Sequence, residues 1–168
     1  MPIAVYLFLL IQLLVVSYVD IRKKIIANYW AIINLIFFII ALFLFRDTYV
    51  IAWKTFLYPF AFLFVGFALY ALKIMGAGDS KYLFSFFFLI PNGYQEDFFV
   101  ILAYSTVIVG FSLLIMNTIK NFDIIISAIR WKNLRYIKEA YGTKFSYAPV
   151  IAVAWIWFGI EFGEKVLW

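Results

Sequence analysis

Two aspartates, Asp20 in SYVDIRKKIIAN and Asp79 in GAGDSK, stand out in a chain that is 67% hydrophobic and only 14% charged. An acidic side chain inside a membrane costs about 2.5–3.5 kcal/mol at the centre on one insertion scale and less toward the ends, so such a residue is a functional candidate. Two carboxylates held close together cannot both ionise readily, so the pair can act as general base and general acid on a water molecule. If the fold brings Asp20 and Asp79 together, aspartic protease chemistry becomes available.

The residue types that the chain lacks narrow this chemistry further. It contains neither cysteine nor histidine, which excludes disulfides, thiol nucleophiles, zinc sites built from thiolate or imidazole, and acid–base catalysis by histidine. Nothing in the sequence implies a metal ion or an organic cofactor. The net charge of +5 does not indicate nucleic-acid binding, because basic residues also gather on the cytoplasmic side of membrane proteins.

Each aspartate also has a purely structural interpretation. Asp79 could be the N-cap of the helix that follows it, accepting hydrogen bonds from backbone N–H groups. Gly76 and Gly78 favour a functional role, because glycine permits a positive φ and close approach of another backbone, which an N-cap does not require. We expect that backbone to belong to an extended peptide substrate. Asp20 could instead lie at the membrane surface and pair with the basic residues Arg22, Lys23 and Lys24.

The elements that must position these residues are membrane-spanning helices. The hydrophobic share of 67% exceeds the roughly 45–50% that is usual in soluble domains. A spanning helix needs about 20 apolar residues, so the chain has room for about six. We predict an all-α fold, a single membrane-embedded domain over residues 1–168 that forms a bundle of about six transmembrane helices. The six apolar segments are Pro2–Val19, Tyr29–Phe45, Val50–Leu72, Asp79–Ile90, Phe98–Met116 and Ala148–Phe162.

The segment 117–147 alternates apolar and basic residues between the fifth and sixth spans. Its apolar residues share a face at helical spacing, which is typical of an amphipathic helix on the cytoplasmic membrane surface. A solvated basic loop that serves only the membrane topology is the alternative. The first apolar segment is expected to be a retained span and not a signal peptide, because the basic cluster follows it.

The distribution of basic residues predicts the orientation. With the amino terminus outside, eleven of the fourteen lysine and arginine residues fall on the inner face, as in membrane proteins generally. In this orientation Asp20 ends the first span and Asp79 begins the fourth. Both therefore lie at cytoplasmic ends of spans, at the same depth, where a bundle could bring them together.

Three motifs carry a resemblance to a known family. Asp20 is followed by a basic stretch and Asn28 in DIRKKIIAN, GAGDSK fits the pattern GxGDxK, and Tyr147-Ala148-Pro149 precedes the last span. With these motifs the chain resembles the type IV prepilin peptidases, membrane-embedded GxGD aspartyl proteases, in their short form without an N-methyltransferase segment. Ala27 stands where that family usually has proline, which loosens the turn into the second span.

The resemblance implies a function and roles for the motif residues. Asp20 and Asp79 would be the catalytic pair, Gly76 and Gly78 would shape the loop, and Lys81 would support the site. The enzyme would lie in the inner, cytoplasmic membrane and remove the leader peptide of a prepilin-like protein substrate at the cytoplasmic face of the lipid bilayer. Lys81 could equally be one more basic residue of the inner face.

Two other functions stay open at this point. A membrane scaffold or assembly subunit would use both aspartates structurally, and replacing them by asparagine would then be mild, because asparagine also caps helices. A proton or cation conductor would need acidic residues along a path through the bilayer, and the apolar segments offer almost none. The sequence does not indicate which precursor is the substrate, whether the protein dimerises, or whether the first and fourth spans touch before substrate arrives.

Overall fold

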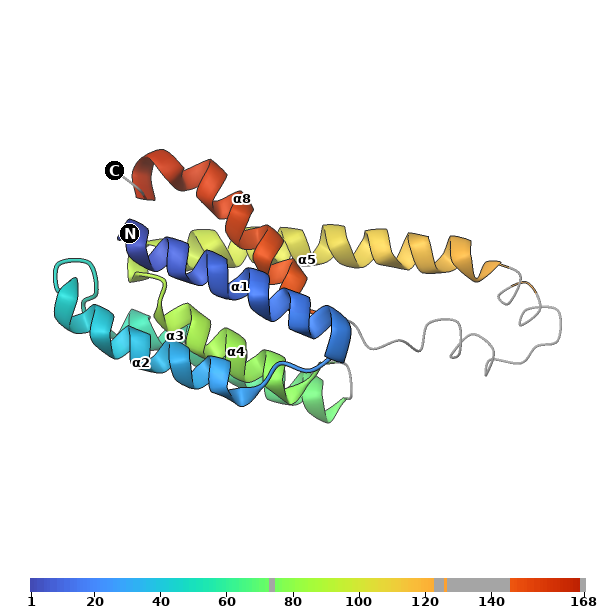
Figure 1. The fold of residues 1–168 in the computed structure, drawn as a ribbon, viewed down its shortest axis with the longest axis horizontal. Coiled ribbons are helices and arrows are strands. Elements are labelled where there is room, and N and C mark those ends of the chain that lie inside the picture. The colour runs from blue at the N-terminus through green and yellow to red at the C-terminus, as the bar shows by residue number, and fades with distance from the viewer. Residues whose placement is uncertain (73–74, 123–125, 127–145, 167–168) are drawn as a thin grey trace.

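The computed structural model describes residues 1–72, 75–122, 126 and 146–166, and this part of the chain contains six helices (Figure 1). No strand occurs among the described residues, which confirms the all-α class. Each predicted apolar segment corresponds to one helix with shifted ends. The helices are α1 (Ile3–Lys23), α2 (Asn28–Leu44), α3 (Trp53–Ala71), α4 (Ala77–Phe88), α5 (Asn92–Lys120) and α8 (Ala148–Val166).

The largest difference from the prediction is in α5. It begins at Asn92 instead of Phe98 and ends at Lys120 instead of Met116. The polar residues at its start join the helix because Pro91 provides a favourable N-terminal boundary with a fixed φ. The predicted amphipathic segment 117–147 therefore begins inside α5, and most of it lies outside the described residues.

The helices form two groups. In the first, α1 packs on α8 and α8 packs on α5; in the second, α4 packs on both α2 and α3. Successive helices run in opposite directions along the bundle (Figure 1). As a result, α1 ends and α4 begins at the same end of the bundle, which we call the aspartate end because Asp20 and Asp79 lie there.

The short helix α4 lies at the centre of the bundle. Its 12 residues rise about 18 Å at 1.5 Å per residue, well below the roughly 30 Å of a bilayer's hydrocarbon core. Phe86 packs edge-on against Trp155 of α8, with ring centroids 5.2 Å apart, and Phe87 stacks on Phe62 of α3 at 4.5 Å. Because α4 contacts helices of both groups, its side chains meet protein on nearly all sides.

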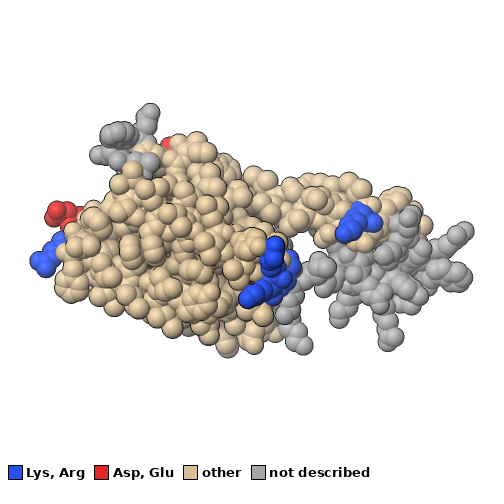
Figure 2. All heavy atoms as spheres, in the orientation of Figure 1, with Lys and Arg blue, Asp and Glu red and all other residues tan. Residues whose placement is uncertain are grey.

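The outer surface of the bundle is suited to lipid. Helices α1, α3 and α5 are long and apolar enough to cross a membrane, while α2 and the stretch Ala148–Gly163 are shorter apolar helices. Large apolar side chains on the outside, such as Phe64 and Val107, are about 70% exposed. On the face that Figure 2 shows, most charged side chains lie toward the two ends of the bundle, and the area between them is almost entirely uncharged. The protein is therefore a membrane protein.

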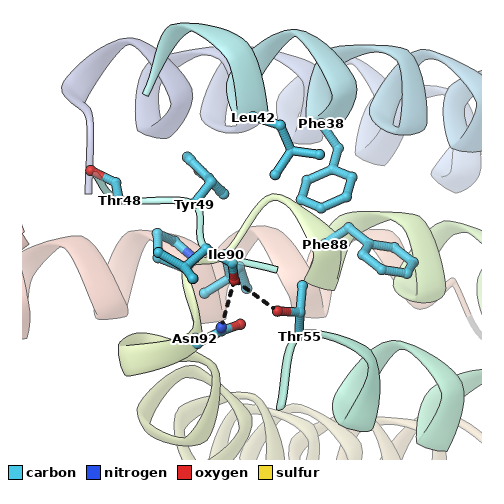
Figure 3. Close-up of a pocket in the computed structure, with 10 residues that line it drawn as sticks. Phe38, Leu42, Thr48, Tyr49, Thr55, Phe88, Ile90 and Asn92 are labelled. Atoms are coloured by element: carbon cyan, nitrogen blue, oxygen red, sulfur yellow. Dashed lines mark hydrogen bonds between the residues drawn. The ribbon is translucent and has the colours of Figure 1, made fainter. Parts of the chain in front are cut away.

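Hydrogen bonds close the end of the bundle opposite the aspartates (Figure 3). The backbone oxygen of Val50 accepts hydrogen bonds from Asn92 Nδ2 and Thr55 Oγ1, both at 3.1 Å. The hydroxyl of Tyr49 donates to the carbonyl oxygen of Leu89 at 2.7 Å, and burial raises the pKa of this phenol. These contacts satisfy the Val50 oxygen before α3 and the Leu89 oxygen after α4, and they join the turn after α4 to the connection between α2 and α3.

A buried polar contact joins the two groups of helices. Tyr82 of α4 is fully buried, and its hydroxyl donates to Gln12 Oε1 of α1 at 3.0 Å. Beside it, Asn34 of α2 donates to Ser85 Oγ at 3.2 Å, and Ser85 donates to the backbone oxygen of Tyr82. This network therefore links α1, α4 and α2 through polar side chains in an otherwise apolar interior.

We predict that Tyr82→Phe lowers the free energy of unfolding by about 1–3 kcal/mol, because the buried oxygen of Gln12 loses its donor. The measurement is equilibrium unfolding of the detergent-purified protein. Tyr104→Phe is the matched control, since Tyr104 is 60% exposed on α5. Equal stability of the two variants would contradict the structural role given to the Tyr82–Gln12 contact.

Candidate functional site

Asp20 lies in the last turn of α1 and is 3% exposed. Its Oδ2 accepts a hydrogen bond at 3.2 Å from the backbone N–H of Ala148, the first residue of α8. Its backbone oxygen accepts from Ser146 Oγ at 3.2 Å and from the N–H of Lys24 at 2.8 Å. The end of α1 is thus bound to the start of α8, and Asp20 sits at that junction.

The basic residues after Asp20 have several partners. Lys24 interacts electrostatically with Asp20, and its ammonium donates to Ser146 Oγ at 2.8 Å. Arg22 places its guanidinium over the ring of Tyr18, 4.7 Å from the centroid. A basic residue therefore does accompany Asp20, as the structural interpretation expects, but the carboxylate is buried in the protein and not displayed at its surface.

Asp79 is the third residue of α4 and is 8% exposed. The helix begins at Ala77, so the N-cap is Gly76 and not Asp79 as the structural interpretation proposed. The side chain nevertheless helps to cap the helix, because Oδ2 accepts a hydrogen bond from the Gly76 N–H at 3.0 Å.

A side chain at either glycine of GAGD would meet a different neighbour. A Cβ at Gly78 would overlap the backbone oxygen of Ile26, in the connection between α1 and α2. A Cβ at Gly76 would lie 2.9 Å from Asp79 Oδ2, and Gly76 itself is exposed. None of the described glycines has a positive φ. The need for glycine at these two positions therefore comes from the close approach of other atoms and not from the expected positive φ. At Gly78 the approaching backbone belongs to the chain itself and not to a substrate.

The contact at Gly78 brings the two aspartates to one site. It presses the start of α4 against the connection that begins four residues after Asp20. The charge of Asp20 acts on Asp79, which places the two carboxyl groups within electrostatic range although 59 positions separate them in sequence. The structure therefore brings together the pair that the sequence singles out.

Tyr147 and Ala148 connect the surroundings of the two carboxyl groups. The N–H of Ala148 binds Asp20, while the side chain of Tyr147 lines a cavity that Asp79 also lines. Thr106 Oγ1 donates its only hydrogen to the Leu102 backbone oxygen at 2.7 Å, so the Tyr147 hydroxyl must donate to Thr106 across 2.9 Å. Burial raises the pKa of Tyr147, and the charge of Asp79 acts in the same direction. Tyr147 is therefore a neutral hydrogen-bond donor.

Lys81 lies on the exposed side of α4. Its ammonium donates to Asn28 Oδ1 at 3.4 Å, which joins the start of α4 to the start of α2. The contact links a residue of the GxGDxK motif to the last residue of the motif that begins at Asp20. This position agrees with a supporting role in holding the two segments together.

Several residues of this region are not predicted by the sequence motifs. Thr106 and Gln12 were not singled out, although each is a polar residue within an apolar helix, and that contrast is a usable signal. Tyr147 was noted only as part of a motif, because its side-chain partner on α5 lies 41 positions away. Ile26 carries no signal at all, since its backbone oxygen and not its side chain meets Gly78.

We predict that Gly78→Ala destabilises the protein by about 1–3 kcal/mol, as overpacking typically does, because the new methyl group must displace the Ile26 backbone. Gly110→Ala in α5 is the control, since a Cβ there meets nothing within 4 Å and alanine favours helix. Both are compared by equilibrium unfolding. A Gly78→Ala protein as stable as Gly110→Ala would show that the close approach at Ile26 is not a constraint.

Comparison with known proteins identifies the family of the chain. The sequence model of the type IV leader peptidase family matches residues 7–119, which include both aspartates, both glycines and Lys81. No curated protein and no solved structure gives a significant match. The match covers more than half of the chain and confirms the resemblance carried by the motifs, so this protein belongs to the type IV leader peptidase family.

Proposed function

We propose that this protein is an aspartyl endopeptidase that removes the leader peptide from type IV pilin-like precursors, with Asp20 and Asp79 activating a water molecule. The observation that carries the proposal is the arrangement of these two buried carboxyl groups. They come from different helices, and both lie buried at the aspartate end of the bundle. Membership of a leader peptidase family supports the substrate class.

The chemistry requires only the two carboxyl groups and water. The ionised carboxylate takes a proton from the water molecule while the water oxygen bonds to the scissile carbonyl carbon. The other carboxyl group, which is protonated, gives its proton to the carbonyl oxygen. The carbon–nitrogen bond then breaks as the leaving amine is protonated. The proton belongs to the pair, so neither Asp20 nor Asp79 is assigned permanently as the base.

The surroundings of Asp79 offer a route for a peptide backbone. Gly76 is exposed, and its missing side chain keeps the space next to Asp79 Oδ2 open. The space beside Gly78, in contrast, is filled by the backbone of Ile26. The proposal therefore assigns the approach of the substrate to the Gly76 side of the carboxylate.

The charge distribution supports cleavage at the cytoplasmic membrane face. The described basic residues at the aspartate end include Arg22, Lys23, Lys24, Lys81 and Lys120. Basic residues near the ends of spans favour the cytoplasmic side. A precursor whose short leader lies in the cytoplasm and whose apolar stem lies in the bilayer would present its scissile bond at this depth.

We predict that Asp20→Asn and Asp79→Asn each reduce kcat/KM for a synthetic prepilin by at least about 100-fold, because each removes half of an acid–base pair. The double variant should be no slower than the slower single variant, since the two residues act as a unit. The assay uses the detergent-purified protein with chelator present throughout.

Asp47→Asn is the matched control for this experiment. Asp47 is an exposed aspartate in the connection after α2, at the opposite end of the bundle, and its substitution should leave cleavage unchanged. Retained cleavage by Asp20→Asn or Asp79→Asn would contradict the mechanism. If well-folded wild type cleaves no prepilin, the alternative of a non-enzymatic scaffold with structural aspartates is favoured. The structural role of Asp79 would then be to accept the hydrogen bond from the Gly76 N–H.

A further inference from the structure

Lys24, the residue that ends α1, has a backbone conformation that does not suit lysine. Its φ of 55° and ψ of 32° lie in the left-handed region, and in the described part of the chain no other residue has a positive φ. A residue with a Cβ costs free energy in this conformation, whereas glycine, which often follows the end of a helix, does not. The backbone therefore does not explain a lysine here, which points to a role for its side chain.

The side chain of Lys24 is bound to the segment that holds Asp20. Its ammonium donates to Ser146 Oγ at 2.8 Å, and Ser146 Oγ donates to the backbone oxygen of Asp20 at 3.2 Å. The backbone N–H of Lys24 donates to the same oxygen at 2.8 Å. Lys24 thus closes a ring of hydrogen bonds at the junction of α1 and α8.

The groups that act on Asp20 come from three elements. Lys24 acts on it electrostatically from the connection after α1, and the backbone N–H groups of Tyr147 and Ala148 bind it from the start of α8. From α4, the pair is completed by Asp79, on which the charge of Asp20 acts. Lys24 supplies a positive charge to this group, and a positive charge stabilises a negative charge on the pair.

Other basic residues at the aspartate end have different surroundings. Arg22 lies over the ring of Tyr18, and Lys81 donates to Asn28 Oδ1. Lys23 is exposed in the last turn of α1, one residue before Lys24. Lys23 therefore provides a comparison for Lys24, because it carries the same charge at the same end of the bundle.

We propose that Lys24 is a positioning residue of the active site, which holds Asp20 against the start of α8 and favours the state of the pair in which one carboxyl group is ionised. The inference rests on the proposed function, because activation of water requires one negative charge on the pair. The competing interpretation is a lysine that serves only the membrane topology, and it predicts that Lys23 and Lys24 are equivalent.

The experiment measures kcat/KM for a synthetic prepilin as a function of pH, with detergent-purified variants. Lys24→Met removes the positive charge, so the ionised pair forms only at higher pH. The acidic limb of the profile should therefore move up by about 0.5 pH unit, the size expected for one ion pair near the surface. On that limb the shift is a loss of about threefold in kcat/KM at a given pH.

Three further variants separate charge from folding. Lys24→Gly suits the left-handed backbone and should show the same shift as Lys24→Met, so that backbone strain does not account for it. Lys24→Arg keeps the charge and should keep the wild-type profile. Lys23→Met removes the same charge one residue earlier and should also leave the profile unchanged.

Two outcomes would overturn the inference. If the acidic limb of Lys24→Met does not move, the ammonium does not act on the pair, whether or not the rate falls. If Lys23→Met moves it equally, the effect belongs to the general charge of this membrane face. In both cases cleavage by wild type still upholds the proposed function. If folded wild type does not cleave the prepilin at any pH, the proposed function is contradicted, and this inference with it.

Discussion

The enclosure of α4 by other helices is the constraint on which the site depends. In the hydrocarbon core every backbone polar group needs a partner within the protein, so a helix too short to cross the membrane is tolerated only where protein surrounds it. The turn after α4 meets this requirement, because Leu89 and Ile90 are buried and the Leu89 oxygen accepts a bond from Tyr49. Surrounding a half-length helix with protein places the carboxylate at its start in a protein environment and not in lipid.

The site is shared between the two groups of helices. Asp20 belongs to the group of α1, α5 and α8, and Asp79 to the group of α2, α3 and α4, so their relative position depends on how the groups meet. Contacts between the groups include Tyr82 with Gln12 and the packing of Phe86 on Trp155. Near the two aspartates, Gly78 also meets Ile26, and Ala148 and Tyr147 connect Asp20 to the cavity of Asp79. Residues remote from the carboxyl groups therefore influence the geometry of the pair.

Much of this arrangement is predictable from the sequence. The features that are not predictable have identifiable physical reasons. Apolar runs locate the six helices of the described residues, because the bilayer imposes both length and hydropathy. The glycines of GAGD correctly indicate close approach, but the pattern cannot say that Ile26 is the partner at Gly78. The start of α5 was predicted too late, because hydropathy excludes the polar residues Glu96 and Asp97, which lie in its second turn. Partners such as Thr106 and Tyr147 require the tertiary fold.

The most direct test of the account is a distance measurement between positions 20 and 79 in the folded protein. The chain has no cysteine, so an Asp20→Cys/Asp79→Cys variant carries only the two thiols of interest. A short bifunctional thiol reagent should join them, and the fragments should remain linked after the chain is cut at a protease site inserted between α2 and α3. The pair Asp20→Cys/Asp47→Cys, at opposite ends of the bundle, should not be joined. Thiols at 20 and 79 that both react with a monofunctional reagent but never cross-link would contradict the central claim that the two aspartates form one site.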